Sequence, residues 1–184
     1  MSVLLWVILG IAAFLILIFV YYFNRFVVLG NNIDNSLSQI DVQLRKRADL
    51  VPNLISTVKG YAKHESKIMK EVTDARKALL SASNLPQKMK AGAELQNALK
   101  SIFAIAENYP QLKANENFLH LQQELSAIED KVAYSRQYYN DSILSYNNSV
   151  KTFPGTFFAN LYGKKEKQFL QMPSESRAVP KVEF

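Results

Sequence analysis

The chain has 184 residues, which suits one domain or a domain with an appendage, and its 48% apolar and 21% charged residues match an ordinary globular composition. It contains no cysteine, which excludes disulfide frameworks, cysteine-ligated zinc, iron–sulfur clusters and thiol catalysis. All 22 basic and 16 acidic residues lie from Arg25 onward, so an uncharged beginning precedes a charged remainder.

The first segment, Val3 to Phe23, is apolar apart from Gly10 and two tyrosines near its end. A helix of these 21 residues is about 31 Å long, which matches a hydrocarbon core of about 30 Å. We therefore predict a transmembrane anchor over residues 1–25. From the aromatic belt and the first charge, the expected membrane-interface anchors are Trp6, Tyr21, Tyr22 and Arg25.

A cleaved signal peptide and a buried core helix are the two alternatives for this segment. A signal peptide has a basic start, a shorter apolar core and a small-residue cleavage site, which this segment lacks. A core helix is rarely apolar on every face over about six turns. The C-terminal flank carries Arg25 and, further on, Arg45, Lys46 and Arg47, so the positive-inside rule favours a large domain on the cytoplasmic side, although Arg25 alone lies close to the membrane.

Beyond Phe26 the apolar residues recur every three or four positions, which predicts helices rather than strands. The first helix is expected to leave the membrane and run to about Ala48. Pro52 lacks a backbone donor and clashes with the preceding turn, so we expect Asp49 to cap a new segment that begins near Leu50. A kinked continuous helix is the alternative.

Three helical segments follow at the same spacing. The segment that starts near Leu50 ends in a loop over residues 81–86, the next covers about Gln87 to Asn108, and the last covers about Asn115 to Lys151. A short amphipathic turn over Thr156 to Leu161 precedes a polar tail.

Long amphipathic segments joined by short loops pack as antiparallel neighbours. The predicted fold class is therefore all-α, with an N-terminal transmembrane helix followed by an antiparallel bundle of about four long helices. We expect an anchor over 1–25, a helical-bundle domain over 26–162 and a polar C-terminal tail over 163–184.

Three stretches carry a resemblance to a known family. They are Asp34 to Glu65 (DNSLSQIDVQLRKRADLVPNLISTVKGYAKHE), Tyr146 to Leu161 (YNNSVKTFPGTFFANL) and Ala178 to Phe184 (AVPKVEF). With the N-terminal apolar helix, the chain resembles the LemA family over essentially its whole length. The resemblance implies a single-pass bacterial membrane protein with a cytoplasmic helical bundle, and it implies no enzymatic activity.

A block of polar and charged residues around Pro52 is the candidate interaction surface. Its members are Arg45, Arg47, Asp49, Asn53, Lys59, Tyr61 and His64. Charge combined with an exposed tyrosine suits recognition of another protein. The alternative for the arginines is a solvated face or pairing with acids on a neighbouring helix. Gly60, which costs about 1 kcal/mol against alanine in a helix, indicates either a close helix approach or a contact site.

The sequence predicts no catalytic residue, metal site or cofactor. A metal needs three or four convergent ligands, whereas His64 and His120 are far apart and the Glu-x-x-His pattern of ferritin-like iron sites is missing. Tyrosines between Tyr134 and Tyr146 suit a helix core or rim better than base stacking, and the net charge of +6 is spread out. We therefore expect no nucleic acid partner.

These features predict a non-enzymatic membrane protein that presents a helical bundle as an interaction or scaffold module. The expected partners are the lipid bilayer and a protein that the sequence does not name. Self-association is a further expectation, although Gly10 alone is not a GxxxG motif. The alternatives are a lipid-binding or membrane-remodelling bundle and, less favoured, a metal enzyme that needs two carboxylates facing inward at matching depths.

Overall fold

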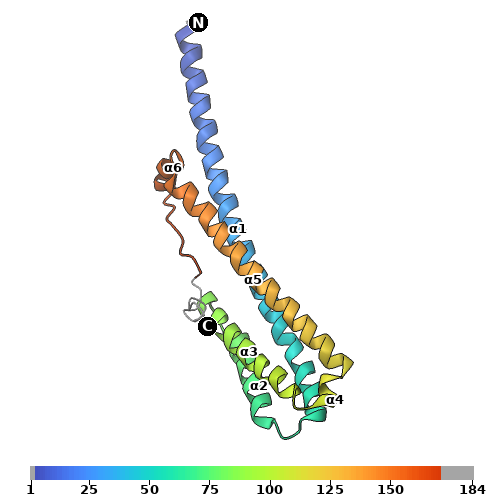
Figure 1. The fold of residues 1–184 in the computed structure, drawn as a ribbon. Coiled ribbons are helices and arrows are strands. Elements are labelled where there is room, and N and C mark those ends of the chain that lie inside the picture. Colours follow the sequence, from blue (N-terminus) through green and yellow to red (C-terminus); the bar gives the residue numbers. More distant parts are fainter. Residues whose placement is uncertain (1–2, 171–184) are drawn as a thin grey trace, which may run out of the picture. The chain divides into compact units, whose positions relative to one another are not determined.

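The computed structural model describes residues 3–170, and its regular structure is entirely helical over that range. The helices are α1 (Val3–Tyr61), α2 (Ser66–Ser81), α3 (Leu85–Ala106), α4 (Pro110–Lys113), α5 (Glu116–Lys151) and α6 (Gly155–Leu161) (Figure 1). The predicted all-α class, with a long apolar N-terminal helix and a bundle after it, is confirmed. Most of the predicted polar tail lies outside the described residues.

The chain divides into two units, and each is described by itself. The first unit comprises Met1–Leu37 and Arg136–Phe184, and the second comprises Ser38–Ser135. Helices α1 and α5 are long enough to contribute to both units.

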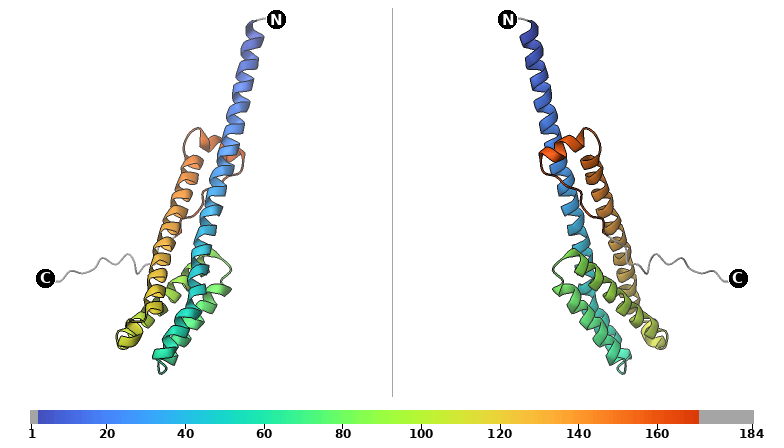
Figure 2. Two further views of the ribbon diagram at one scale, coloured as in Figure 1. Left: turned by 90° about the vertical axis from the view of Figure 1, so that its right-hand side faces the viewer. Right: turned by 90° about the vertical axis from the view of Figure 1, so that its left-hand side faces the viewer.

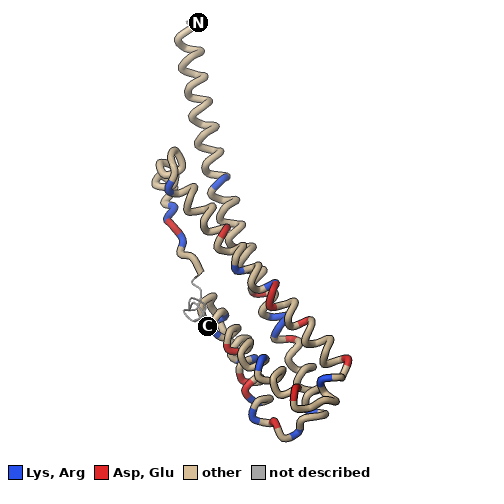
Figure 3. Tube along the Cα trace, in the orientation of Figure 1, with Lys and Arg blue, Asp and Glu red and all other residues tan. Residues whose placement is uncertain are grey.

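Helix α1 begins with the apolar segment, and Figure 3 shows that charged residues are confined to the chain beyond it. The most apolar window of the helix has a mean hydropathy of 3.2, and none of that window is buried within the protein. By length and composition α1 is suited to cross a membrane, and no other helix in residues 3–170 meets the same criterion.

In the first unit, the part of α1 that follows the apolar segment lies beside the C-terminal part of α5 and beside α6, as both views of Figure 2 show. A small apolar core joins these three helices. Its buried members are Phe26, Ile33, Ile143, Tyr146 and Ala159.

In the second unit, the last part of α1 packs with α2, α3 and the first part of α5, and successive long helices run in opposite directions (Figures 1 and 2). Buried apolar side chains recur along each helix at the spacing that the sequence predicted. They include Ile40, Leu44, Val51, Leu54 and Val58 of α1, Met69, Val72 and Leu79 of α2, Leu95, Leu99 and Ile102 of α3, and Phe118, Leu121, Leu125, Ile128 and Val132 of α5.

The expected interruption at Pro52 is wrong, because α1 continues through it as one helix to Tyr61. In a helix the backbone N–H at position 52 would bond the carbonyl of Ala48, and proline has no N–H to give. The structure supplies another donor: Arg76 Nε of α2 donates to the Ala48 carbonyl oxygen at 2.7 Å. A side chain from the neighbouring helix thus replaces the bond that Pro52 removes.

The first helix instead ends at Tyr61, and a short turn over residues 62–65 leads into α2. Gly60 lies near this end, and a Cβ added there would meet nothing within 4 Å. The close helix approach offered as one explanation of Gly60 is therefore wrong. Gly60 is the next-to-last residue of α1, and the chain reverses direction over the turn at residues 62–65.

The Arg76–Ala48 bond predicts a coupling between two substitutions. R76A leaves the Ala48 carbonyl without a donor and should lower the free energy of unfolding by about 1–2 kcal/mol. In a P52A background the restored N–H bonds Ala48, so R76A should cost about 1 kcal/mol less there. Urea unfolding of the detergent-solubilised chain, followed by circular dichroism, measures both. K77A on the exposed side of α2 is the control, and an equal cost of R76A in both backgrounds contradicts the assignment.

Candidate functional site

Four of the seven predicted surface residues share one exposed face of α1 in the second unit. Arg45, Asp49 and Asn53 follow one another at steps of four residues, and Lys59 lies on the same side of the helix. All four are exposed. The continuity of α1 through Pro52 keeps these four side chains on one broad face of the helix.

Arg47 does not belong to that surface, because its side chain is only 2% exposed. Its guanidinium forms an ion pair with Glu129 of α5 and donates from Nη1 to the carbonyl oxygen of Gly92 in α3 at 3.4 Å. Burial lowers the pKa of Arg47 from its ordinary value, and the charge of Glu129 opposes that shift. The prediction of Arg47 as an interaction residue is therefore wrong, and pairing with an acid on a neighbouring helix describes it.

Tyr61 and His64 lie at the end of the bundle where α1 turns into α2. The Tyr61 hydroxyl accepts a hydrogen bond from Asn115 Nδ2 at 3.1 Å, and the tyrosine is 40% exposed. The next residue after His64, Glu65, accepts from the Tyr109 hydroxyl at 3.1 Å, a bond that raises the pKa of Tyr109. These two bonds fix the turn and leave His64 exposed.

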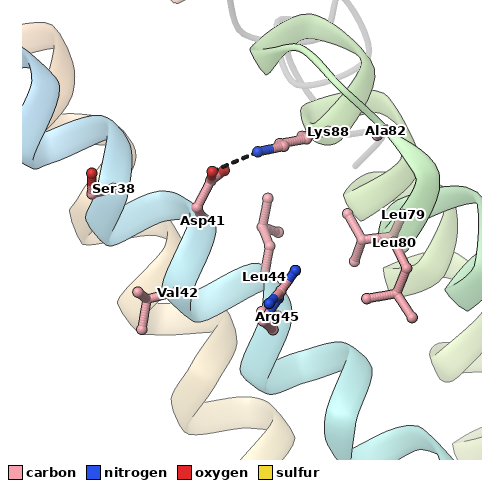
Figure 4. Close-up of a pocket in the computed structure, with 9 residues that line it drawn as sticks. All are labelled: Ser38, Asp41, Val42, Leu44, Arg45, Leu79, Leu80, Ala82 and Lys88. Atoms are coloured by element: carbon pink, nitrogen blue, oxygen red, sulfur yellow. Dashed lines mark hydrogen bonds and ion pairs between the residues drawn. The ribbon is translucent and has the colours of Figure 1, made fainter.

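A pocket of about 390 Å³ lies between α1, α2 and α3 in the same unit (Figure 4). Its lining residues are Ser38, Asp41, Val42, Leu44 and Arg45 of α1, Leu79 and Leu80 of α2, Ala82, and Lys88 of α3. Lys88 pairs with Asp41 at one end of the pocket, as the dashed line in Figure 4 shows. The pocket therefore combines an apolar floor with charged groups at its rim.

Two features of this pocket, which we call the α1–α3 groove, make it a candidate for binding. Val42 is 50% exposed and Leu80 is 42% exposed, so apolar surface is open to a ligand. Arg45 makes no ion pair within residues 3–170, and Figure 4 shows its side chain beside Leu44, on the side of α1 that faces Leu79 and Leu80. A ligand that brings an apolar group and a carboxylate would match both features.

The predicted membrane-interface residues lie in the first unit. Trp6 is 62% exposed and Tyr21 is 57% exposed. Tyr22 is half-buried, because its ring stacks on Phe158 of α6 with the centroids 4.7 Å apart. Arg25 donates from Nε to the hydroxyl of Ser149 in α5 at 3.2 Å. Both residues thus connect the end of the apolar segment to the C-terminal part of the chain.

Sequence reasoning missed the groove but contained a signal for it. Val42 and Leu80 are apolar residues that stand outside the buried positions of their own helices. When a helix packs through its apolar stripe, apolar residues outside the stripe remain exposed. Two such residues on adjacent helices form an apolar surface patch. Within residues 3–170 no three histidine, aspartate or glutamate side chains gather as metal ligands would.

Comparison with known proteins gives a family match and several named relatives. The LemA family model matches residues 36–184. The chain belongs to the LemA family. Magnetosome protein MamQ of Magnetospirillum gryphiswaldense is 25% identical, with 88% of this chain and 69% of the relative covered. Magnetosome protein MamQ 1 of Paramagnetospirillum magneticum is also 25% identical, with 89% and 70% covered.

A further LemA-family relative is Protein LemA of Metamycoplasma hominis, which is 27% identical over 76% of this chain and 67% of its own length. The family resemblance drawn from the sequence is confirmed. Together with the exposed apolar part of α1, these relatives support a membrane-associated protein of the LemA type.

The buried ion pair yields a stability prediction. E129Q keeps the shape of Glu129 but removes its charge, which leaves the Arg47 charge buried without an anion. The free energy of unfolding should fall by about 1–3 kcal/mol. E124Q on the same helix, where the carboxylate is 44% exposed, should stay within about 0.5 kcal/mol of the parent. Equal effects of the two substitutions in chemical denaturation would refute a stabilising role for the pair.

Proposed function

We propose that this LemA-family protein is a single-pass, non-enzymatic membrane adaptor whose bundle binds a segment of a partner protein in the α1–α3 groove. The bundle is on the cytoplasmic side. The single observation that carries the proposal is the groove itself, with exposed Val42 and Leu80 beside Arg45. The exposed row that continues from Arg45 to Lys59 extends the contact surface along α1.

Charge complementarity identifies the kind of partner. Lys88 and Asp41 neutralise one another at one rim, whereas Arg45 forms no ion pair within residues 3–170, although Asp49 lies one turn further along the same face. A partner segment with a carboxylate facing Arg45 and an apolar side chain between Val42 and Leu80 satisfies both features. The pocket of about 390 Å³ has the size of a site for one or two side chains.

An enzymatic role with carboxylates in the bundle interior was the least favoured alternative. Glu129 approaches the interior, but it is engaged by Arg47 and remains 42% exposed. This arrangement supports a structural use of the carboxylate, because a metal or acid–base centre needs ligands that the fold has not already neutralised.

Site-specific photo-crosslinking in intact cells tests the groove. A photoreactive side chain placed at Val42 or Leu80 should crosslink the same partner protein, whereas one at Lys46, which is exposed but outside the groove, should not. R45E should abolish both crosslinks, and K46E, the matched control, should leave them unchanged. A charge reversal of the facing acid in the partner should restore the R45E crosslink. Crosslinks that are equal at all three positions, that survive R45E, or that join only two copies of this chain overturn the proposal.

The cytoplasmic location has a separate test. The chain has no cysteine, so S56C on the exposed face of α1 gives a single thiol. In intact cells this thiol should resist a membrane-impermeant maleimide and react only after the membrane is permeabilised. Arg25, which lies at the end of the apolar segment, is the physical reason. Full labelling in intact cells places the bundle outside and contradicts this part of the proposal.

A further inference from the structure

The short helix α6 exposes an apolar face that no part of residues 3–170 covers. Phe157 and Leu161 are one turn apart on α6 and are 63% and 58% exposed, and Phe153, in the turn just before the helix, is 86% exposed. The opposite side of the same segment is packed, since Ala159 is buried and Phe158 stacks on Tyr22. Large apolar side chains that remain exposed on a packed segment indicate a contact with apolar surroundings, such as lipid or another protein.

Contacts with α1 fix the position of α6 along the apolar segment. The Tyr162 hydroxyl donates to the carbonyl oxygen of Phe19 at 2.7 Å, and the Tyr162 ring lies 5.1 Å from the Phe19 ring and 5.7 Å from the Phe23 ring. Phe19 is six residues before Arg25, which is about 9 Å along a helix. Helix α6 therefore lies beside the last turns of the apolar segment, at the level of the aromatic belt.

This position is closely packed rather than loosely held. A Cβ added at Gly155 would lie 2.1 Å from the carbonyl oxygen of Ser149 and 3.5 Å from the Tyr22 ring, so only glycine permits the approach of α6 to α5 and α1. Ser149 in turn accepts the hydrogen bond from Arg25. Helix α6 is thus held beside α1 at the end of the apolar segment, as Figure 2 shows.

Lysines flank the exposed apolar row. Lys151 ends α5 and pairs with Glu166 at 2.8 Å, and Lys167 lies over the Tyr146 ring at 5.5 Å. The side chains of Lys164 and Lys165 have no acidic partner within residues 3–170. Lysines next to an apolar surface at a membrane boundary interact favourably with anionic headgroups.

We propose that Phe153 and α6 form an interfacial segment that inserts Phe153, Phe157 and Leu161 into the headgroup–acyl boundary of the membrane that α1 enters, with Lys164 and Lys165 on anionic headgroups. The inference rests on the membrane insertion of α1 within the proposed function. It is independent of the α1–α3 groove. It identifies a lipid-binding site, and its occupant is the bilayer itself.

Tryptophan fluorescence of the full chain in vesicles tests the proposal. Trp6 is the only tryptophan, so a W6F/F157W protein reports on position 157 alone. In vesicles with anionic lipid its emission should shift to shorter wavelength, and lipids brominated near the headgroup should quench most of it. The control is W6F/Y138W, because Tyr138 is an exposed aromatic on α5 about 20 Å before Lys151 along the helix. It should keep a water-like emission and lose little intensity.

Two further proteins separate the causes of each result. W6F/F153W is a second reporter in case F157W disturbs the packing, and it should be quenched in the same way. The parent chain reports on α1 through Trp6. If Trp6 is quenched by brominated lipid while positions 153 and 157 are quenched only by aqueous iodide, the anchor stands and the interfacial segment is refuted. If emission at 157 is blue-shifted yet insensitive to brominated lipid and returns to a water-like spectrum on dilution of protein in lipid, a second copy covers this face and the proposal is also refuted.

The lysines have their own readout in the same experiment. K164E/K165E in the F157W background should reduce quenching in vesicles that contain anionic lipid and leave it unchanged in neutral vesicles. The matched control is K46E, an exposed lysine of the second unit. Equal quenching with and without the two lysines on anionic vesicles overturns the headgroup contact.

Discussion

One backbone carbonyl in the middle of α1 takes its hydrogen bond from a neighbouring helix rather than from α1 itself. Ala48 would lose its intrahelical donor at Pro52, and a helix interrupted there would place the residues before and after it in unrelated directions. The guanidinium of Arg76, which belongs to the neighbouring helix α2, supplies the missing donor. Because α1 is continuous, the buried side chains from Ile40 to Val58 lie on one face of the helix, and the exposed residues that begin at Arg45 lie on another. That bond stabilises α1 at the point where it packs against α2 in the second unit.

The periodicity of the sequence predicted most of the helices, because burial of one stripe per helix leaves a pattern that the residues carry locally. The boundaries of α3 and α5 lie within two residues of those expected. The interruption at Pro52 was the main error, and its cause is not local. A proline predicts a break from its own chemistry, whereas the compensating donor comes from Arg76, 28 positions after the Ala48 carbonyl that it serves.

The candidate site shows the same division between local and distant information. Arg47 follows Leu44 by three positions and precedes Val51 by four, so its place on the apolar stripe was visible in the sequence, and its charge concealed that place. The groove needed α2 and α3 to be positioned beside α1 before Leu80 and Lys88 could be seen next to Arg45. The stacking of Tyr22 on Phe158 joins residues too far apart in the chain for any spacing rule to connect them.

The aromatic residues that pack over the end of the apolar segment come from the last part of the described chain. The ribosome delivers Tyr22 and Phe26 near the start of synthesis, and it delivers Phe158 and Tyr162 only after more than a hundred further residues have been made. During that interval the aromatic flank of the apolar segment is bare. A chain that ended before residue 153 would therefore keep the apolar segment but could not complete the core of its first unit.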